Sequence, residues 1–159
     1  MRQGCLIWVG KEGRKDPEAL ICDRYLQRIK HYTGMDVKIL KPFMSKDENE
    51  TRRREGTRIL ERIEPSDYVI LCDEGGKELT SPELAQLLNA PKPSAARRIV
   101  WIIGGAMGVS DATRQRADFV LSLSRMTLPH ALARVVLLEQ IYRALSIRAG
   151  HPYHHEGGS

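Results

Sequence analysis

Residues 99–130, IVWIIGGAMGVSDATRQRADFVLSLSRMTLPH, contain two apolar strand patterns that each run into a loop of small or polar residues. The first strand, residues 99–103, is followed by a glycine-rich turn at 104–108, and the second, residues 118–123, by a loop at 124–130. In an open α/β sheet, ligands bind where the carboxyl ends of strands meet such loops. This stretch therefore predicts a ligand cleft.

The segments around this stretch alternate between strand and helix patterns. Further strands are predicted at residues 4–10, 35–40 and 68–73, helices at residues 16–32, 47–64, 80–89, 110–116 and 129–147, and a connecting loop at residues 91–96. Continuous apolar runs such as residues 4–10 are typical of strands that are covered on both faces. Every connection is long enough for a crossover. The chain is therefore predicted to be an α/β protein with a mainly parallel sheet of five to six strands and helices on both faces.

Length and composition set the broad class of the protein. At 159 residues, with 42% hydrophobic and 28% charged residues, the chain is typical of one globular domain, predicted as residues 1–156 with a flexible tail at 157–159. Three widely spaced cysteines indicate reduced thiols rather than disulfides or a zinc motif. No segment has the length and composition of a signal peptide or a membrane span. We therefore expect a cytoplasmic protein that uses neither a membrane nor a metal.

Positive charge is concentrated in residues 47–64. This segment carries five arginines, Arg52, Arg53, Arg54, Arg58 and Arg62, in a chain with a formal net charge of +5. Such an excess of positive charge favours an anionic partner, and nucleic acid is the commonest one. Two interpretations of the segment stay open: a solvated helix of mixed charge, or a basic helix that faces RNA.

The last predicted helix has a broad apolar face. Its apolar residues include Leu132, Val135, Val136, Leu138, Tyr142 and Leu145. This face is wider than contact with one sheet requires. It therefore predicts a second surface that packs against another subunit.

Three short motifs point to other functions, and each of them is incomplete. The turn at 104–108 has the spacing GGxxG rather than the GxGxxG of dinucleotide-binding folds, and no acidic residue follows at the distance that would hold a ribose. Gly10-Lys11 lacks the earlier glycine and the following hydroxyl residue of a phosphate-binding loop. The histidines within residues 151–155 lack a paired cysteine or aspartate at metal-binding spacing, so a tail lying across the edge of a cleft fits them better.

Longer motifs are spread over nearly the whole chain. They are Val9-Gly10-Lys11, Arg28-Ile29-x-x-Tyr32, Glu55-Gly56-x-x-Ile59-Leu60, Asp73-Glu74-x-Gly76-Lys77, Ile103-Gly104-Gly105-x-x-Gly108, Leu121-Ser122-Leu123-Ser124-x-Met126-Thr127-Leu128-Pro129-His130, Glu139-Gln140-x-Tyr142-Arg143-Ala144 and His151-Pro152-Tyr153-His154. Because these motifs occur in this order and at these distances, the chain resembles the RlmH family of the SPOUT, or trefoil-knot, methyltransferases. The match is specific because all of the motifs occur together.

The resemblance implies a C-terminal trefoil knot that holds S-adenosylmethionine (SAM) in three loops. The residues that it implies for cofactor binding are Cys72, Gly104, Leu123, Ser124, Arg125, Met126, Thr127 and Leu128. It also implies a homodimer with the active site at the subunit interface. The implied reaction is methylation of N3 of a pseudouridine in large-subunit (23S) ribosomal RNA, either free or in the assembled ribosome.

Transfer of a methyl group to an imide nitrogen requires alignment with the methyl donor and the loss of a proton. The residues that the resemblance implies for this chemistry are Glu139, Arg143, Tyr153 and His154. Arg143 is expected to anchor a phosphate or a carbonyl of the target. Tyr153 or His154 is expected to assist proton removal.

Several positions depart from the residues that are usual in the family. Cys72 stands in place of a larger aliphatic residue, Ala106-Met107 in place of a Pro-Glu pair, and Arg125 brings a charge into the cofactor loop. These departures motivate an alternative function of another class. The protein would then be a non-catalytic RNA-binding or ribosome-binding protein that kept the knot and lost turnover.

Overall fold

The predicted strands form one sheet in the computed structural model, which describes residues 3–11, 13 and 15–154. Among these residues there are five strands: β1 (Gln3–Val9), β2 (Met35–Leu40), β3 (Tyr68–Glu78), β4 (Arg98–Ile103) and β5 (Phe119–Ser122). Their order across the sheet is β2-β1-β4-β3-β5, and every pair of neighbours is parallel. These pairings confirm the prediction of a parallel sheet. Since parallel strands are joined by crossovers, the strand ends that carry the predicted ligand loops lie at one edge of the sheet.

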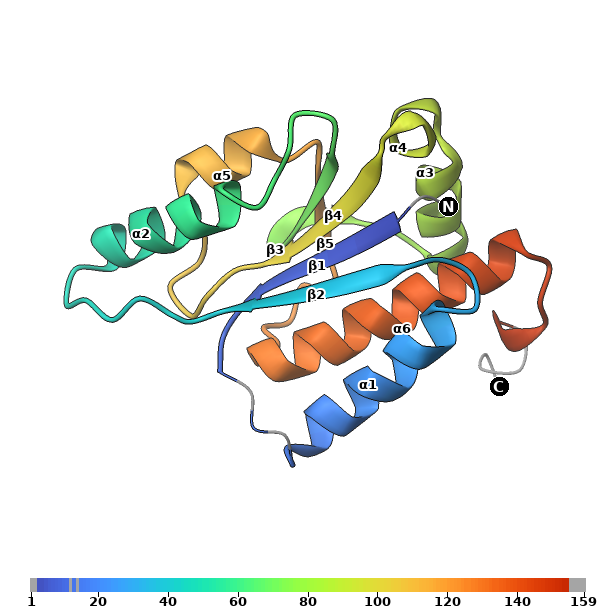
Figure 1. Cartoon of the computed structure of the whole chain (residues 1–159), viewed down its shortest axis with the longest axis horizontal. Helices are drawn as coiled ribbons and strands as arrows, with labels where there is room; N and C mark the ends of the chain where they lie inside the picture. The colour runs from blue at the N-terminus through green and yellow to red at the C-terminus, as the bar shows by residue number, and fades with distance from the viewer. Residues whose placement is uncertain (1–2, 12, 14, 155–159) are drawn as a thin grey trace.

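Helices cover both faces of this sheet, as predicted. They are α1 (Pro17–Ile29), α2 (Glu48–Leu60), α3 (Ser81–Asn89), α4 (Pro91–Ala95), α5 (Asp111–Arg116) and α6 (His130–Arg148). Figure 1 shows α1 and α6 side by side on one side of the sheet and α2 with α5 on the other. The α/β fold class is therefore confirmed, whereas the threading of the predicted C-terminal knot stays a prediction. None of the helices in the described residues is long and apolar enough to cross a membrane.

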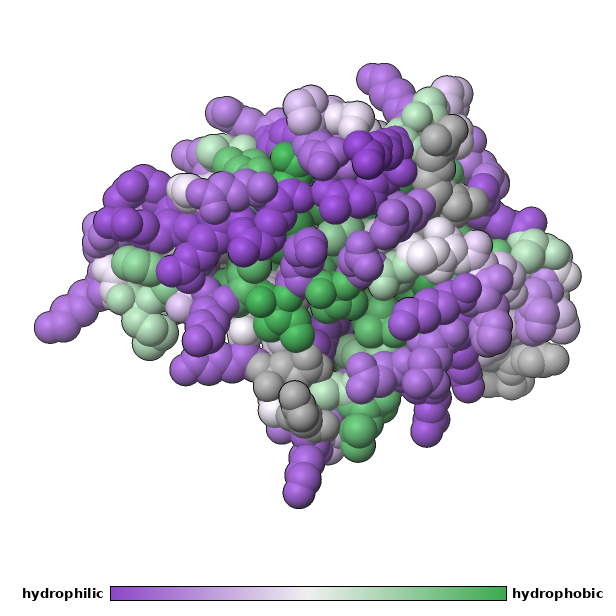
Figure 2. All heavy atoms as spheres, in the orientation of Figure 1, coloured by the Kyte–Doolittle hydropathy of each residue, from purple (hydrophilic) through white to green (hydrophobic). Residues whose placement is uncertain are grey.

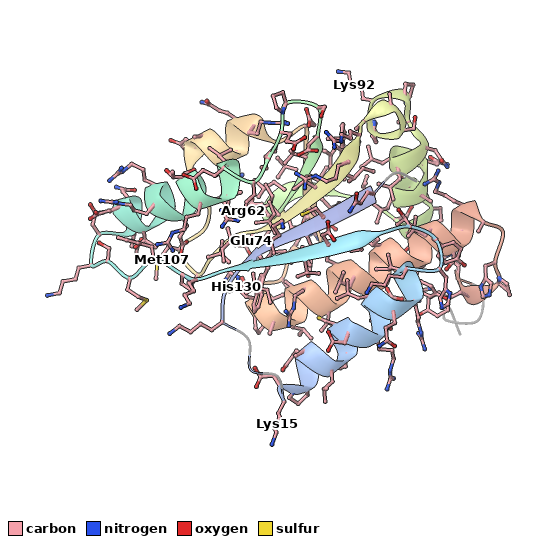
Figure 3. The ribbon with its side chains drawn as sticks, in the orientation of Figure 1. Lys15, Arg62, Glu74, Lys92, Met107 and His130 are labelled. Carbon is pink, nitrogen blue, oxygen red and sulfur yellow. The ribbon has the colours of Figure 1, made fainter. Side chains whose placement is uncertain are left out.

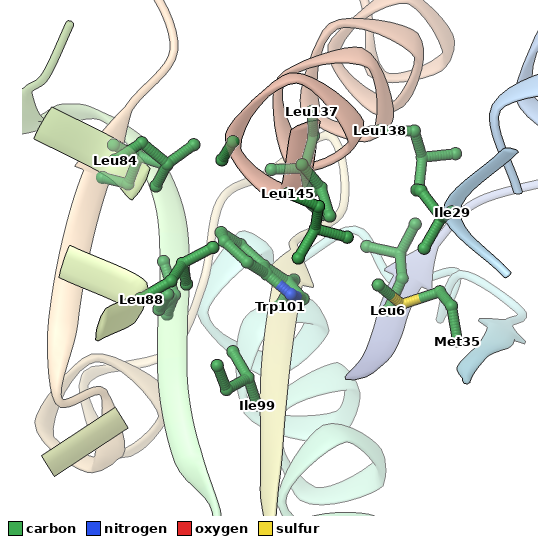
Figure 4. Close-up of a cluster of buried hydrophobic side chains, with 14 of the residues drawn as sticks. Leu6, Ile29, Met35, Leu84, Leu88, Ile99, Trp101, Leu137, Leu138 and Leu145 are labelled. Carbon is green, nitrogen blue, oxygen red and sulfur yellow. The ribbon is translucent and has the colours of Figure 1, made fainter. Parts of the chain in front are cut away.

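Alternate residues of the central strands point into two separate hydrophobic cores. In β4, Trp101 and its neighbours two residues away face α1, α3 and α6, while Val100 and Ile102 face the α2 side. Trp101 is completely buried, and Figure 4 places it between Leu88 and the side chains of α6. This packing fixes the start of α6 at the carboxyl end of the strands.

The broad apolar face of α6 is largely used within the chain. The helix lies between α1 and α3, and Leu137, Leu138, Ile141 and Leu145 are buried there. The width of the apolar face therefore reflects packing against two helices as well as the sheet. Of the large apolar side chains on α6, Leu132 is left 44% exposed. The apolar width alone therefore does not indicate a second subunit.

Two segments differ from the prediction. Residues 91–96 were expected to form a loop, but Pro91–Ala95 form the short helix α4, because a proline in the first turn of a helix costs no intrahelical hydrogen bond. The strand predicted to end at residue 73 continues as β3 to Glu78 and pairs again with β5 after an irregularity between Cys72 and Lys77. Pairing with a distant strand overrides the local turn preference of Glu74–Lys77.

Candidate active site

A pocket of about 270 Å³ lies at the carboxyl ends of β3, β4 and β5. Three chain segments meet there: residues 72–74, where the apolar part of β3 ends, the glycine-rich turn after β4 and the loop after β5. The residues predicted for the cofactor that line it are Cys72, Gly104, Leu123, Ser124, Met126, Thr127 and Leu128. The loops around Gly104 and Thr127 therefore converge, as the strand-and-loop pattern predicted.

Arg125 is the predicted cofactor residue whose position differs. In the described part of the chain it does not line the pocket, and its side chain is 85% exposed. Its Nε lies 3.2 Å from Glu78 Oε1, on the extension of β3 that the sequence pattern missed. The structure therefore places the Arg125 guanidinium beside Glu78 and not in the pocket lining, and the role of Arg125 in cofactor binding stays a prediction.

The glycine-rich turn forms one wall of the pocket through its backbone. Gly108 has φ +83°, a conformation that side chains with a Cβ rarely adopt, and its N–H donates to the Gly105 carbonyl at 3.0 Å. A Cβ on Gly104 would lie 2.5 Å from Val109 Cγ1. The turn can therefore bring its main chain close to a ligand only with these glycines.

The loop after β5 forms the opposite wall and is held by two hydrogen bonds. The Met126 N–H donates to Ser124 Oγ at 2.9 Å, which tightens the loop. The Thr127 hydroxyl donates to Glu74 Oε2 at 3.0 Å, which ties the loop to the end of β3. In Figure 3, Glu74 lies close to His130, another residue that lines the pocket.

Some residues that line the pocket were not assigned to it from the sequence. Asp73, Glu74 and His130 belong to the quoted motifs, and Ala133 lies one turn into α6. Their positions along the chain could have assigned them to the pocket, because Asp73 and Glu74 come directly after an apolar run and His130 ends the loop after β5. These residues add acidic and imidazole groups to a rim that otherwise consists of backbone and apolar atoms.

Cys72 contributes bulk rather than reactivity to the pocket. Burial, together with the charge of Asp73, raises the pKa of the Cys72 thiol to about 12. The thiol is therefore protonated near neutral pH and is a poor nucleophile. Its place at the end of β3 is that of an apolar wall residue.

The four predicted catalytic residues lie together at the other end of α6. Gly150, with φ +71°, and the bond from the His151 N–H to the Ser146 carbonyl at 2.9 Å turn the tail back along the helix. Arg143 then lies against this tail, and its Nη1 is 3.3 Å from His154 Nδ1. Because a guanidinium only donates, His154 Nδ1 is the acceptor in this contact.

Glu139 is the common acceptor among the predicted catalytic residues Glu139, Arg143, Tyr153 and His154, which we call the catalytic cluster after this predicted role. Arg143 donates to Glu139 Oε1 through Nη2 at 2.6 Å and Nε at 3.0 Å, and this bonding raises the pKa of Arg143. The Tyr153 hydroxyl donates to the same oxygen at 3.3 Å. The tyrosine ring packs edge-on against Tyr142, with 4.7 Å between the ring centroids, which holds the tail in place.

The catalytic cluster and the pocket are separate within one chain. Of the residues that the structure describes, no member of the cluster lines the pocket. His130 lines the pocket, and a rise of 1.5 Å per residue places Glu139 and Arg143 about 13 and 20 Å further along α6. Residues 151–154, the part of the tail that the structure describes, do not line the pocket of their own chain. The tail across a cleft edge stays a prediction, and His155, a further part of it, lies outside the described residues.

The arginines of residues 47–64, which include α2, are mostly bound within the chain. Arg54 lies 3.6 Å from Glu50, Arg58 donates to the Lys41 carbonyl at 2.8 Å, and Arg62 donates to the Arg58 carbonyl at 2.9 Å. Figure 2 shows hydrophilic side chains over this helix. These contacts favour the interpretation of α2 as a solvated helix of mixed charge. In the part of the chain that the structure describes, no group of three histidine, cysteine or acidic side chains could hold a metal ion.

Comparison with known proteins identifies the class. Residues 3–154 match the family model described as predicted SPOUT methyltransferase, so the chain belongs to the SPOUT methyltransferases. Curated relatives carry the name ribosomal RNA large subunit methyltransferase H. The relative from Geobacter metallireducens is 41% identical over 150 residues, 94% of this chain and 97% of that protein. The relative from Christiangramia forsetii is 37% identical over 153 residues, with the same coverage of both chains.

A third relative of this name, from Desulfovibrio desulfuricans, is 46% identical over 132 residues, which cover 82% of this chain and 84% of that protein. Among solved structures, the SpoU methyltransferase AviRb from Streptomyces viridochromogenes, in complex with AdoMet, gives a TM-score of 0.45 at 13% identity. That match covers 92% of this chain and 60% of the solved chain. The family assignment rests on the family model and the curated relatives.

Proposed function

We propose that this protein is a SAM-dependent methyltransferase of large-subunit ribosomal RNA that methylates N3 of a pseudouridine. The observation that carries the proposal is the convergence of three loops, with nearly all of the predicted cofactor residues, on one pocket in a chain that belongs to the SPOUT methyltransferases. The names of the curated relatives support the RNA substrate. Such a substrate places the protein in the cytoplasm, with the ribosome.

The pocket suits an adenosine-bearing cofactor by shape and by chemistry. Most residues of the turn at 104–108 and of the loop at 123–128 line it, and Ile103, Val109 and Leu128 supply apolar walls for a flat ring. When bound, SAM supplies a methyl group activated by the sulfonium. The chain itself contributes orientation, since a ligand held by rigid backbone loops presents its reactive atom in one direction.

We further propose that a second copy of the chain completes the site. The catalytic cluster lies too far from the pocket of its own chain to act there, so the cluster that serves a pocket comes from the partner. Apolar side chains close to the pocket end of α6 support this: Leu20 is 58% exposed, Ile21 40% and Leu132 44%. The family resemblance also implies a homodimer, with each chain forming one knotted domain of residues 1–156. Residues 155–159, including the tail at 157–159, lie outside the described residues.

Within the catalytic cluster, the contacts favour different roles for the four residues. Arg143 is the permanent cation and suits a phosphate or carbonyl of the target. Glu139 accepts hydrogen bonds from both Arg143 and Tyr153, so it orients the cluster. His154 is the candidate for moving the proton of the imide, once the target displaces its contact with Arg143.

Tyr153 is expected to act as a hydrogen-bond donor and not as the base. Burial, the neighbouring Tyr25 and the charge of Glu139 raise the pKa of Tyr153 to about 12. The phenol is therefore neutral at working pH. Tyr153→Phe should lower kcat/KM by about tenfold or less and leave the shape of the pH profile unchanged between about pH 6 and pH 10. A rate that rises with pH in the unsubstituted chain and no longer rises in Tyr153→Phe would show that the phenolate is the base.

The direct test of the proposed function is methylation of ribosomes from a strain that lacks the modification. The purified chain and SAM are expected to give one methylated nucleoside, identified by mass spectrometry as 3-methylpseudouridine. A methyl group on an unmodified uridine would contradict the proposed substrate. Binding of ribosomes without binding of SAM would instead support the alternative of a non-catalytic RNA-binding protein.

A further inference from the structure

Helix α2 contacts the glycine-rich turn from outside the pocket. The guanidinium of Arg52 donates to the Met107 carbonyl at 3.0 Å, across 55 residues of sequence. Figure 3 shows Met107 beside this helix. Arg52 is itself oriented by Asn49 and by Glu48, 3.7 Å away, and its side chain is 27% exposed. One end of the turn is therefore held by a side chain that does not touch the pocket.

Glu55, one turn further along α2, lies under the other end of the glycine-rich turn. It is 3% exposed, and its Oε2 accepts from the Phe43 N–H at 2.9 Å. Its Oε1 is buried and has no hydrogen-bond partner among the described residues. A Cβ on Gly105 would lie 2.5 Å from this oxygen. The carboxylate and the main chain of Gly105 are thus in direct contact.

The helix is held in place by the segment that follows the turn. A Cβ on Gly56 would meet Ser110 Oγ and, at 3.1 Å, Thr113 Oγ1. Ser110 caps α5 by accepting from the Thr113 N–H at 3.2 Å. Helix α2 therefore packs closely against the start of α5, and this packing fixes the distance from which Arg52 and Glu55 reach the turn.

We propose that Arg52 and Glu55 are positioning residues for the glycine-rich turn of the cofactor pocket. The turn has few side chains of its own to hold its shape, and both residues act on its main chain from α2. Within the described part of the chain, neither of them lines the pocket. They act on the ligand only through the backbone of residues 105–107, so a preformed pocket depends on them. The inference relies on the proposed function only for the identity of the ligand.

Calorimetric titration with SAM tests the role of Arg52. Arg52→Ala removes the bond to the Met107 carbonyl from a partly exposed position, and we expect about tenfold weaker affinity for SAM. In steady-state kinetics, KM for SAM should rise by the same factor while kcat at saturating SAM stays within about twofold. The matched control is Arg53→Ala: this neighbouring side chain is exposed, and its removal should leave the affinity for SAM unchanged.

A pair of variants at Glu55 distinguishes positioning from a general loss of stability. Glu55→Gln keeps the size of the side chain and an acceptor for the Phe43 N–H, so it should bind SAM within about threefold of the unsubstituted chain. Glu55→Ala removes both and should bind about tenfold more weakly. Equal losses in the two variants would contradict positioning through this hydrogen bond and contact.

Hydrogen exchange of the cofactor-free protein gives a second measurement. Arg52→Ala should speed amide exchange at residues 105–108 while Arg53→Ala does not. If the unsubstituted chain binds no SAM, the proposed function fails, and the exchange rates alone then decide whether these residues hold the turn. If Arg52→Ala and Glu55→Ala both bind SAM as the unsubstituted chain does and exchange at 105–108 is unchanged, the inference is wrong.

Discussion

Arg143→Ala is expected to lower kcat/KM for ribosome methylation by about a hundredfold while the affinity for SAM stays within about twofold. Arg143 makes two bonds to Glu139, lies 3.3 Å from His154 and stacks over the Tyr153 ring at 4.9 Å. Its removal takes away the anchor for the target and the contact that orders the other three residues. Steady-state kinetics on ribosomes and calorimetry with SAM measure the two quantities separately.

Two control variants narrow the interpretation of this loss. Arg143→Lys keeps the positive charge but not the planar fork, so it should retain more activity than Arg143→Ala and less than the unsubstituted chain. Arg97→Ala changes the net charge equally at a side chain that is 77% exposed and that pairs, among the described residues, with Glu64 at the amino end of the sheet. It should leave the kinetics unchanged. Full activity of Arg143→Ala would show that Arg143 takes no part in the reaction.

The second large effect is expected at the pocket wall. In Gly104→Val, the Cβ would lie 2.5 Å from Val109 Cγ1, and the branched side chain would push the glycine-rich turn away from the loop after β5. We expect affinity for SAM to fall at least a hundredfold. Differential scanning calorimetry and SAM titration of the same protein check that the chain is folded and that binding is lost.

Gly34→Val is the matched control for this substitution. Among the described residues, a Cβ on Gly34 meets Gln3 Cγ at an ordinary distance of 3.6 Å and the Gln3 carboxamide at 4.0 Å, and this glycine is exposed far from the pocket residues. It should bind SAM normally. Normal binding by Gly104→Val would mean that the turn does not form the cofactor wall.

The sheet was predictable because its strands are short continuous apolar runs that only a covered sheet can bury. Residues 4–10 and 99–103 are of this kind, and they pair in the structure as β1 and β4. The extension of β3 to Glu78 was not predictable, since Glu74–Lys77 has turn composition and becomes strand only through pairing with β5. Helix α4 was missed because two prolines within five residues usually indicate a loop.

The site was predictable where it follows from the position of a residue in the fold. Gly104 and Thr127 lie at strand ends, and strand ends meet at one edge of a parallel sheet. The contact of Arg125 with Glu78 was not predictable, because no local pattern shows that the end of β3 lies beside the loop after β5. Arg52 and Glu55 were missed as supports of the turn, because their contacts with residues 105–107 depend on how α2 packs, which no local pattern encodes.

The central claim is that the pocket of one chain works with the catalytic cluster of another. Its most direct test combines Gly104→Val and Arg143→Ala chains, carrying different affinity tags, by co-expression. Each homodimer should be nearly inactive. A mixed dimer has one intact pocket facing one intact cluster, so an equal mixture should recover about a quarter of the unsubstituted activity.

Purified mixed dimers should accordingly reach about half of the unsubstituted activity and bind one SAM per dimer. Mixed dimers that are no more active than either parent would contradict the claim, because they would show that pocket and cluster must belong to the same chain.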